Sequence, residues 1–518
     1  MTDRSAPWWE QRWAVAALAL LSAVPLLWPD VPPLVDLPGH IARYRVQLDI
    51  GGTPLLQGWY SFQWALIGNL GVDLLVMPLA KVFGLELAVK LIVLSIPPMT
   101  VAGFLWVARE VHGRVPPTAL FAVPLAYNFP LSFGFVNFAL SMAFAFLAFA
   151  LWLRLARLGR LRLRAVLFVP ISIALWVTHA YGWGTLGVMA FSAELVRQHD
   201  KGRGFVESGF RSGIHCLSLC FPLVLMAAWR TGAAGGDTGD WFNWRAKQAW
   251  VMMALRDRWK AFDLASVCLL FGIIIFLPMA KKVSFSRNLA ASALFLLLVY
   301  ILLPRIVFGS AYADMRLVPY MLAVGVIALR LRPETSERFA RGAAIAGMAF
   351  LLVRIGGNTV SFWMYDRAYD RELAAIDRIP YGARVVSFVG TTCQRPWMMT
   401  RLEHIPGMAL VRKHAFSNDQ WSMAGGQLLM ANYPAGRPFT HDPSQIVSRV
   451  QCRGEFWYPI DEALRIFPRS AFDYVWMIDP PRYDARLTQG LQPLWRSGTS
   501  VLFRVVDRTQ PEAPAARK

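Results

Sequence analysis

The chain contains few charged residues for its length, and this scarcity excludes an ordinary soluble domain. Only 17% of its 518 residues are Asp, Glu, Lys or Arg, and 56% are hydrophobic; soluble domains contain about 25% charged residues. The hydrophobic residues form blocks of roughly 15–22 residues, which is enough for a helix to cross a hydrocarbon core about 30 Å thick. The composition therefore predicts a polytopic α-helical membrane protein.

Five cysteines are too few for a disulfide framework, and no spacing between them resembles a zinc site. Cys216, Cys220 and Cys268 lie within apolar segments, where a thiol behaves as a small core residue. Cys393 and Cys452 lie in a more polar C-terminal region. They could form a disulfide if that region is outside the cytoplasm, and the sequence leaves this pairing open.

Acidic residues are scarce as well, with 33 Asp and Glu against 53 Lys and Arg and a formal net charge of +20. In a soluble chain this excess would suggest nucleic acid, but no basic–aromatic binding module accompanies it. Many of the cations lie instead in short loops between apolar blocks, where they orient a membrane protein. We expect membrane lipid around the chain and no nucleic-acid partner.

The loop charges predict a topology in which residues 30–84 form a first outer loop. With that loop outside, five loops that each contain at least two Lys or Arg become cytoplasmic, as the positive-inside rule expects; these loops are 109–114, 154–164, 197–211, 281–287 and 330–342. One outer loop, 230–262, breaks this trend with six cations. Eleven spans are then expected, at about 13–29, 86–108, 116–131, 136–153, 165–180, 183–196, 213–229, 263–280, 288–303, 319–331 and 343–357.

The region after the last predicted span is more polar. Residues 358–508 are expected to form an extracytoplasmic α/β domain, with residues 1–357 as the transmembrane domain and residues 509–518 as a disordered tail. Buried strands are predicted at Arg384–Val389, Phe472–Ile478 and Val501–Val506, and a helix at Arg367–Ile379.

The joint after the first apolar segment contains Asp36-Leu-Pro-Gly-His40, the most plausible place for chemistry. Asp36 and His40 would share one face of a helix. In one interpretation Asp36 is an N-terminal cap and His40 an interfacial polar residue. In the other, Asp36 is a general base that takes a proton from an attacking hydroxyl, and His40 orients it or the substrate. Arg43 and Tyr44 continue the helix and could hold an anionic group.

The segment Val35-Asp36-Leu-Pro-Gly-His40-Ile-Ala-Arg43-Tyr44 resembles the first outer loop of the GT-C superfamily of integral-membrane glycosyltransferases, of the protein O-mannosyltransferase and aminoarabinose transferase type. Residues 60–84 resemble the membrane-parallel segment that precedes the second helix of that family. The resemblance implies transfer of a sugar from a polyprenyl-phosphate donor to a glycolipid, polysaccharide or protein acceptor, at the outer face of a bacterial inner membrane. A transporter or flippase of a lipid-linked saccharide, and a polysaccharide ligase or polymerase, are the alternatives.

Such a transfer needs a carboxylate near the acceptor and cations near the phosphate. Arg316 resembles the family's arginine that faces the carrier phosphate, and an ion pair with Asp314 is its alternative role. Lys247 and Arg256 are weaker candidates, since interfacial cations often snorkel. His179, at another outer turn, is either a substrate contact or a hydrogen-bonded structural residue. No cofactor is certain, and a divalent metal, Mg²⁺ or Mn²⁺, is the possible one.

Overall fold

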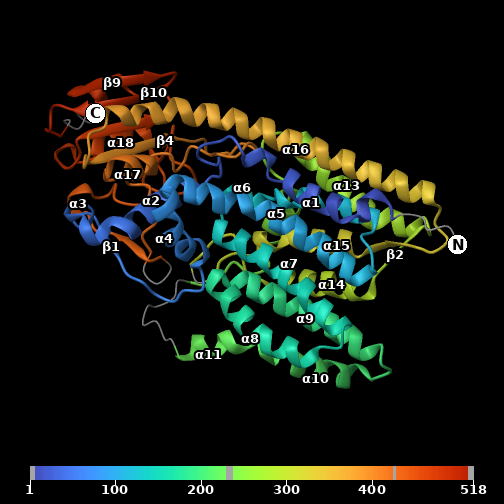
Figure 1. The fold of residues 1–518 in the computed structure, drawn as a ribbon. Coiled ribbons are helices and arrows are strands. Elements are labelled where there is room, and N and C mark those ends of the chain that lie inside the picture. The colour runs from blue at the N-terminus through green and yellow to red at the C-terminus, as the bar shows by residue number, and fades with distance from the viewer. Residues whose placement is uncertain (1–5, 229–236, 308, 424–426, 511–518) are drawn as a thin grey trace. The chain divides into compact units, whose positions relative to one another are not determined.

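The computed structural model describes residues 6–228, 237–307, 309–423 and 427–510 (Figure 1). The last eight residues of the predicted disordered tail lie outside this range. The chain divides into two compact units. The helical unit comprises Met1–Trp28, Leu66–Leu75 and Lys90–Phe362, and the sheet unit comprises Pro29–Ala65, Val76–Val89 and Trp363–Lys518.

The helical unit is built almost entirely from helices, and α7, α8 and α9 pack on one another (Figure 1). Three helices, α4, α5 and α16, contribute residues to both units. The bounds are α1 Arg12–Leu21, α4 Gly71–Phe83, α5 Leu85–His112, α6 Phe129–Phe133, α7 Val136–Arg157, α8 Leu161–Thr178, α9 Ala180–His199, α10 Phe205–Cys216, α11 Phe221–Ala228, α12 Trp244–Met252, α13 Lys260–Met279, α14 Arg287–Leu302, α15 Val318–Ile327 and α16 Glu337–Leu373, with a short ribbon of β2 Val283–Phe285 and β3 Leu329–Leu331.

Five of the described helices are long and apolar enough to cross a membrane: α5, α7, α8, α13 and the segment Glu337–Arg378. A sixth results if Phe205–Leu219 and Phe221–Ala227, which meet at 61°, count as one broken span. Arg12–Leu26 and Arg287–Leu302 are shorter apolar helices. The membrane character of the chain agrees with the sequence analysis, and the exact count of eleven spans stays a prediction.

Two of the predicted helical segments have a different form in the structure. Much of the predicted span at 116–131 is a 3₁₀-helix, Pro117–Ala126. Its prolines lack the N–H that an α-helix needs and clash with the preceding turn. The helix predicted to begin at Arg367 is instead the end of α16, which passes through Gly356 and Gly357 without a break. Gly357 serves close packing, since a Cβ there would lie 2.8 Å from the ring of Phe262.

The sheet unit contains a six-stranded sheet in the order β7-β6-β4-β8-β10-β9. Strand β4 is parallel to β6 and β8, whereas β10 is antiparallel to β8 and β9. All three strands predicted from the sequence are present, as β4, β8 and β10. The strand bounds are β4 Val385–Gly390, β6 Ile446–Ser448, β7 Tyr458–Pro459, β8 Tyr474–Ile478, β9 Leu491–Ser497 and β10 Ser500–Val505. Strand β8 is buried along its whole length, as expected for a strand covered on both faces.

Most of the predicted first outer loop, 30–84, belongs to the same compact unit as residues 363–518, whereas its residues 66–75 belong to the helical unit. Strand β1 (Tyr60–Phe62) of that loop pairs with β5 (Leu429–Ala431). The helices of the unit are α2 Leu37–Asp49, α3 Pro54–Gln57, α17 Gly407–Lys413 and α18 Ile460–Ile466, and α2 packs on α17. The β1–β5 pairing and the packing of α2 on α17 bring Asp36 close to residues from the C-terminal part of the chain.

Cys393 and Cys452 form a disulfide, which answers the question that the sequence left open. Cys393 follows β4 and Cys452 follows β6, and these two strands are parallel neighbours. The carboxyl ends of parallel neighbours lie at the same edge of a sheet. The disulfide therefore joins two loops at one edge of the sheet.

Candidate active site

Asp36 occupies the residue before the first turn of α2, but its side chain makes no capping hydrogen bond. Its backbone is already in the right-handed helical region, with φ −86° and ψ −10°, whereas a capping side chain normally requires an extended backbone. The capping interpretation is therefore wrong for the Asp36 side chain. The carboxylate is 13% exposed, and its Oδ1 lies 4.0 Å from Nε2 of His404.

His404 lies between three carboxylates within the sheet unit. Its Nε2 is 4.0 Å from Oδ1 of Asp36 and 3.8 Å from Oδ1 of Asp442. Its Nδ1 donates to the backbone carbonyl of Asp419 at 3.1 Å and is 3.6 Å from Oδ2 of the same residue. Because both ring nitrogens face acceptors, the geometry favours the imidazolium, which carries a proton on each nitrogen.

The surroundings of His404 raise its pKa. Burial of the ring lowers the pKa, but the hydrogen bond with Asp419 and the charges of Asp442, Asp36 and Asp419 outweigh that effect and raise the pKa to about 9. His404 is therefore a cation at neutral pH.

The two other carboxylates of the cluster are held in place by neutral donors. Oδ1 of Asp419 accepts from Ser417 Oγ at 2.7 Å and from Gln420 Nε2 at 3.1 Å. Oδ1 of Asp442 accepts from Gln445 Nε2 at 2.7 Å. Burial raises the pKa of Asp442, although the positive charge of His404 and the hydrogen bond from Gln445 lower it. Asp442 faces the same ring nitrogen of His404 as Asp36, and Asp419 faces the other one.

Trp421 contacts both histidines of the site. Its ring centre is 4.4 Å from that of His404 and 4.8 Å from that of His40. Gly39 allows this approach, since a Cβ there would lie 2.9 Å from the Trp421 indole and 3.0 Å from Nδ1 of His404. Gly407 plays the same part on α17, because its Cβ would lie 3.1 Å from Ala42 of α2. Gly39 thus lets α2 approach Trp421 and His404, and Gly407 lets α2 and α17 pack closely.

His40 has the opposite charge state to His404. Desolvation within the fold, together with the charges of Arg43 and His404, holds the pKa of His40 well below its ordinary value. Its Nδ1 has no hydrogen-bond partner among the described residues. Arg43 lies 4.8 Å from the ring centre of Tyr44. The neutral His40 ring can accept a hydrogen bond from a substrate hydroxyl.

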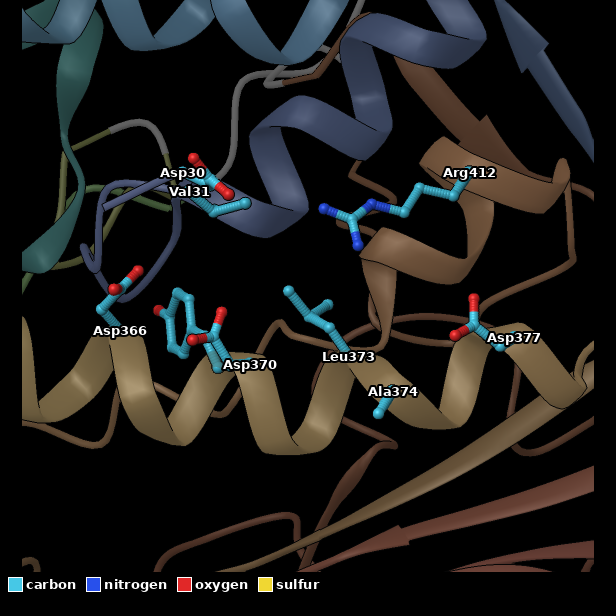
Figure 2. A pocket seen from close by; sticks show the side chains of 9 residues that line it. Asp30, Val31, Asp366, Asp370, Leu373, Ala374, Asp377 and Arg412 are labelled. Atoms are coloured by element: carbon cyan, nitrogen blue, oxygen red, sulfur yellow. The ribbon is translucent and has the colours of Figure 1, made fainter. Parts of the chain in front are cut away.

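The cavity shown in Figure 2 is a different feature of the sheet unit. It encloses about 290 Å³ and does not contain Asp36 or His404. Carboxylates from the end of α16 line one side, and Arg412 of α17 faces them (Figure 2). Its lining residues are Asp30, Val31, Asp366, Tyr369, Asp370, Leu373, Ala374, Asp377 and Arg412. No residue that the sequence predicted for the site takes part.

In the helical unit, the structure brings Arg316 and His179 to the same aromatic rings. The Arg316 guanidinium is 4.2 Å from the ring centre of Phe135, 5.7 Å from Tyr181 and 6.0 Å from Phe138. The His179 ring is 5.7 Å from Phe138 and 5.5 Å from Tyr181. Nδ1 of His179 accepts from the backbone N–H of Tyr181 at 3.1 Å and so caps α9. The hydrogen-bonded structural role of His179 is therefore present.

Lys247 and Asp314 form a buried ion pair, with Nζ 3.1 Å from Oδ2. Lys247 also donates to the carbonyls of Tyr300 and Leu303, both at 2.8 Å. An ammonium group has three N–H donors, and these three acceptors occupy them. We therefore do not include Lys247 in the proposed site. Arg256 lies 5.0 Å from the ring centre of Phe129.

Sequence reasoning missed His404, Asp419, Asp442 and Trp421. The one local signal was the polar run Ser417-Asn-Asp-Gln420, which reads as a solvated loop but is fully buried. Four consecutive buried polar residues require many internal partners, and such a network is typical of a specialised site. Among the described residues, no group of three or more His, Cys, Asp or Glu side chains has an arrangement suited to a metal ion. No step of the proposed reaction is therefore assigned to a metal, and dependence on a divalent metal stays a prediction.

No protein-family model matches the chain, and no curated protein matches it. Among solved structures, the chain is similar to the crystal structure of ArnT from Cupriavidus metallidurans bound to undecaprenyl phosphate. The match covers 96% of this chain and 98% of that chain, with 12% identity and a TM-score of 0.45. Because the superposition is loose, the function is inferred from the side chains of this chain.

Proposed function

We propose that this chain is a membrane glycosyltransferase that moves a sugar from a polyprenyl-phosphate donor to an acceptor at the outer face of a bacterial inner membrane. The observation that carries the proposal is the environment of Asp36. Its carboxylate directly follows the first apolar segment, retains 13% exposure, and lies beside a buried imidazolium. A nearby cation favours the ionised form of a carboxylate, which is the state that a general base requires.

In the proposed reaction, an acceptor hydroxyl oxygen attacks the anomeric carbon of the donor sugar. The bond between that carbon and the phosphate oxygen breaks, and its electron pair leaves with the lipid phosphate. Asp36 takes the proton of the attacking hydroxyl, and the neutral ring of His40 orients that hydroxyl by accepting a hydrogen bond. Arg43 and Tyr44, one turn further along α2, are assigned to an anionic part of the substrate.

Arg316 is proposed to bind the donor phosphate. A guanidinium can bind phosphate through two parallel hydrogen bonds, and its charge stabilises the negative charge of the leaving group. The rings of Phe135, Phe138 and Tyr181 restrict its motion, which lowers the entropy lost on binding. His179, which contacts two of these rings, is proposed to hold them in place beside Arg316.

The disulfide supports an extracytoplasmic location for the sheet unit. Structural disulfides persist in oxidising compartments and are rare in the cytosol, and Cys393 and Cys452 are paired. Lipid-linked sugars are the appropriate donors on that side of the membrane, since nucleotide sugars are cytoplasmic. The assay described next identifies the sugar, the carrier length and the acceptor.

The proposal is tested with purified protein in detergent micelles, a panel of radiolabelled polyprenyl-phosphate sugars, and a lipid extract as acceptor. Asp36→Asn should abolish sugar transfer while the protein stays folded and monodisperse. Asp49→Asn is the matched control, because Asp49 ends the same helix and pairs with Arg45 and His414. Product formed in micelles excludes pure transport, which requires two compartments. Full turnover by Asp36→Asn would contradict the proposed base, and a parallel assay with EDTA tests dependence on Mg²⁺ or Mn²⁺.

A further inference from the structure

We propose that His404 is the positioning residue for Asp36: its imidazolium keeps the catalytic carboxylate ionised and correctly oriented, and Asp419 and Asp442 hold the imidazolium in place. This proposal rests on the proposed function and deepens it, because it makes the transfer reaction depend on the charge of a residue in the C-terminal region. His404 is assigned no contact with substrate.

The His404 ring lies between Asp36 and Asp419. Nε2 of His404 faces Oδ1 of Asp36 at 4.0 Å, and the opposite ring nitrogen is held by the carbonyl and carboxylate of Asp419. Trp421 packs against the ring of His404, with 4.4 Å between the two ring centres. The π-electrons of an indole attract a cation, so this contact favours the imidazolium. The His404 side chain is only 4% exposed. The ring is thus held on two sides, and its remaining polar atom is directed at Asp36 and Asp442.

His404 contributes positive charge to a cluster of carboxylates. Three carboxylates, those of Asp36, Asp419 and Asp442, surround one imidazolium. Of the other ionisable groups nearby, His40 is neutral because its pKa is lowered, Arg43 follows it on α2, and Glu403 acts on Asp442. Without the imidazolium, three like charges would lie close together. Such a cluster takes up a proton more readily, and a protonated Asp36 is no longer a base.

The proposal predicts a particular pH profile. In the wild type, activity should fall as the pH rises through about 9, because His404 then loses its proton. In His404→Gln, this alkaline limb should disappear. The acidic limb of kcat/KM should move upward by about one pH unit or more, because the unbalanced carboxylates hold a proton. At pH 7, kcat should fall about 10–100-fold while KM for the donor changes little, as expected for a lost transition-state interaction.

A charge-compensating variant gives a sharper test. His404→Gln combined with Asp419→Asn removes one positive and one negative charge, and should return the acidic limb toward that of the wild type. The asparagine Oδ1 can still accept from Ser417 and Gln420. His414→Gln is the matched control, since His414 also pairs with a carboxylate of α2, Asp49, at 2.8 Å. Its pH profile should equal that of the wild type.

A uniform drop in the activity of His404→Gln, with both limbs unmoved, would assign His404 a merely structural role and overturn the proposal. If His404→Gln does not fold, Asp419→Asn alone decides: it weakens the stabilisation of the imidazolium and should move the alkaline limb below pH 9. An unmoved limb in that variant would overturn the proposal too. If the wild type transfers no sugar, the proposed function fails. The charge on His404 is then still read from the difference in pH-dependent unfolding between the wild type and His404→Gln.

Discussion

Raising the pH should destabilise the folded protein through His404. The pKa of His404 is about 9 in the folded state, against 6.5 for the ordinary group, and each unit of difference corresponds to about 1.4 kcal/mol. A raised folded-state pKa stabilises the fold fully below pH 6.5, and this stabilisation is lost as the pH rises to 9. The loss amounts to at most about 3 kcal/mol.

The buried carboxylate of Asp442 adds no pH dependence of its own over this range. Burial raises the pKa of Asp442, which means that the folded state pays a cost for keeping that carboxylate ionised above its ordinary pKa. This cost is present across the whole range from pH 6.5 to 9, and it does not change the direction of the His404 effect. A loss of about 2 kcal/mol would lower the unfolding midpoint of a domain of 150–250 residues by roughly 4–8 °C.

Thermal unfolding of the wild type and of His404→Gln in the same detergent, between pH 6 and pH 9.5, measures this effect. The wild-type midpoint should fall as the pH rises through this range. The midpoint of His404→Gln should stay nearly constant once the pH dependence of the other titrating groups, measured with His414→Gln, is subtracted. Parallel curves for the wild type and His404→Gln would refute a cationic His404. A wild-type unfolding midpoint that rises with pH would contradict the predicted direction of the effect.

Three further predictions address packing and charge. Gly39→Ala should destabilise the protein by about 1–3 kcal/mol and lower activity, because its Cβ would lie 2.9 Å from an indole carbon; Gly51→Ala, with no atom near its Cβ, should behave as wild type in the same unfolding assay. Lys247→Met should cost about 3–5 kcal/mol by leaving the Asp314 carboxylate buried without its cation, and adding Asp314→Asn should restore much of the folded yield. Arg316→Lys should raise KM for the donor about tenfold. In a thermal-shift assay the variant should bind polyprenyl phosphate more weakly but polyprenol equally well, and equal effects on both lipids would contradict the phosphate role of Arg316.

Much of the fold follows from patterns that are local in the sequence. The apolar blocks identify a membrane protein because the length of a block relates directly to the thickness of a bilayer. Strands β4 and β8 were predicted because continuous apolar β-branched and aromatic runs are typical of buried parallel strands. The sequence predicted a span ending at 357 and a separate helix from Arg367, whereas the structure has the single helix α16, which continues through Gly357 where that residue packs against Phe262.

The candidate site was predictable only in part. Asp36 and His40 were found because their spacing places them one helical turn apart. Their charges were not, because the pKa of His40 depends on desolvation and that of His404 on carboxylates from other parts of the chain. The polar run from Ser417 to Gln420 has the composition of a loop, because a sequence does not distinguish a hydrated polar run from one that is buried with hydrogen-bond partners.

By itself, the sequence determined what each segment can do: which blocks enter lipid, which runs become strands, and where a carboxylate follows the first apolar helix. Only the tertiary structure decided which distant side chains meet. It paired β1 with β5, placed α2 against α17, and so set His404, Asp419 and Asp442 around the carboxylate of Asp36. The physical reason is that hydrophobic periodicity is a local property of a chain, whereas electrostatic environment is a property of three-dimensional neighbours.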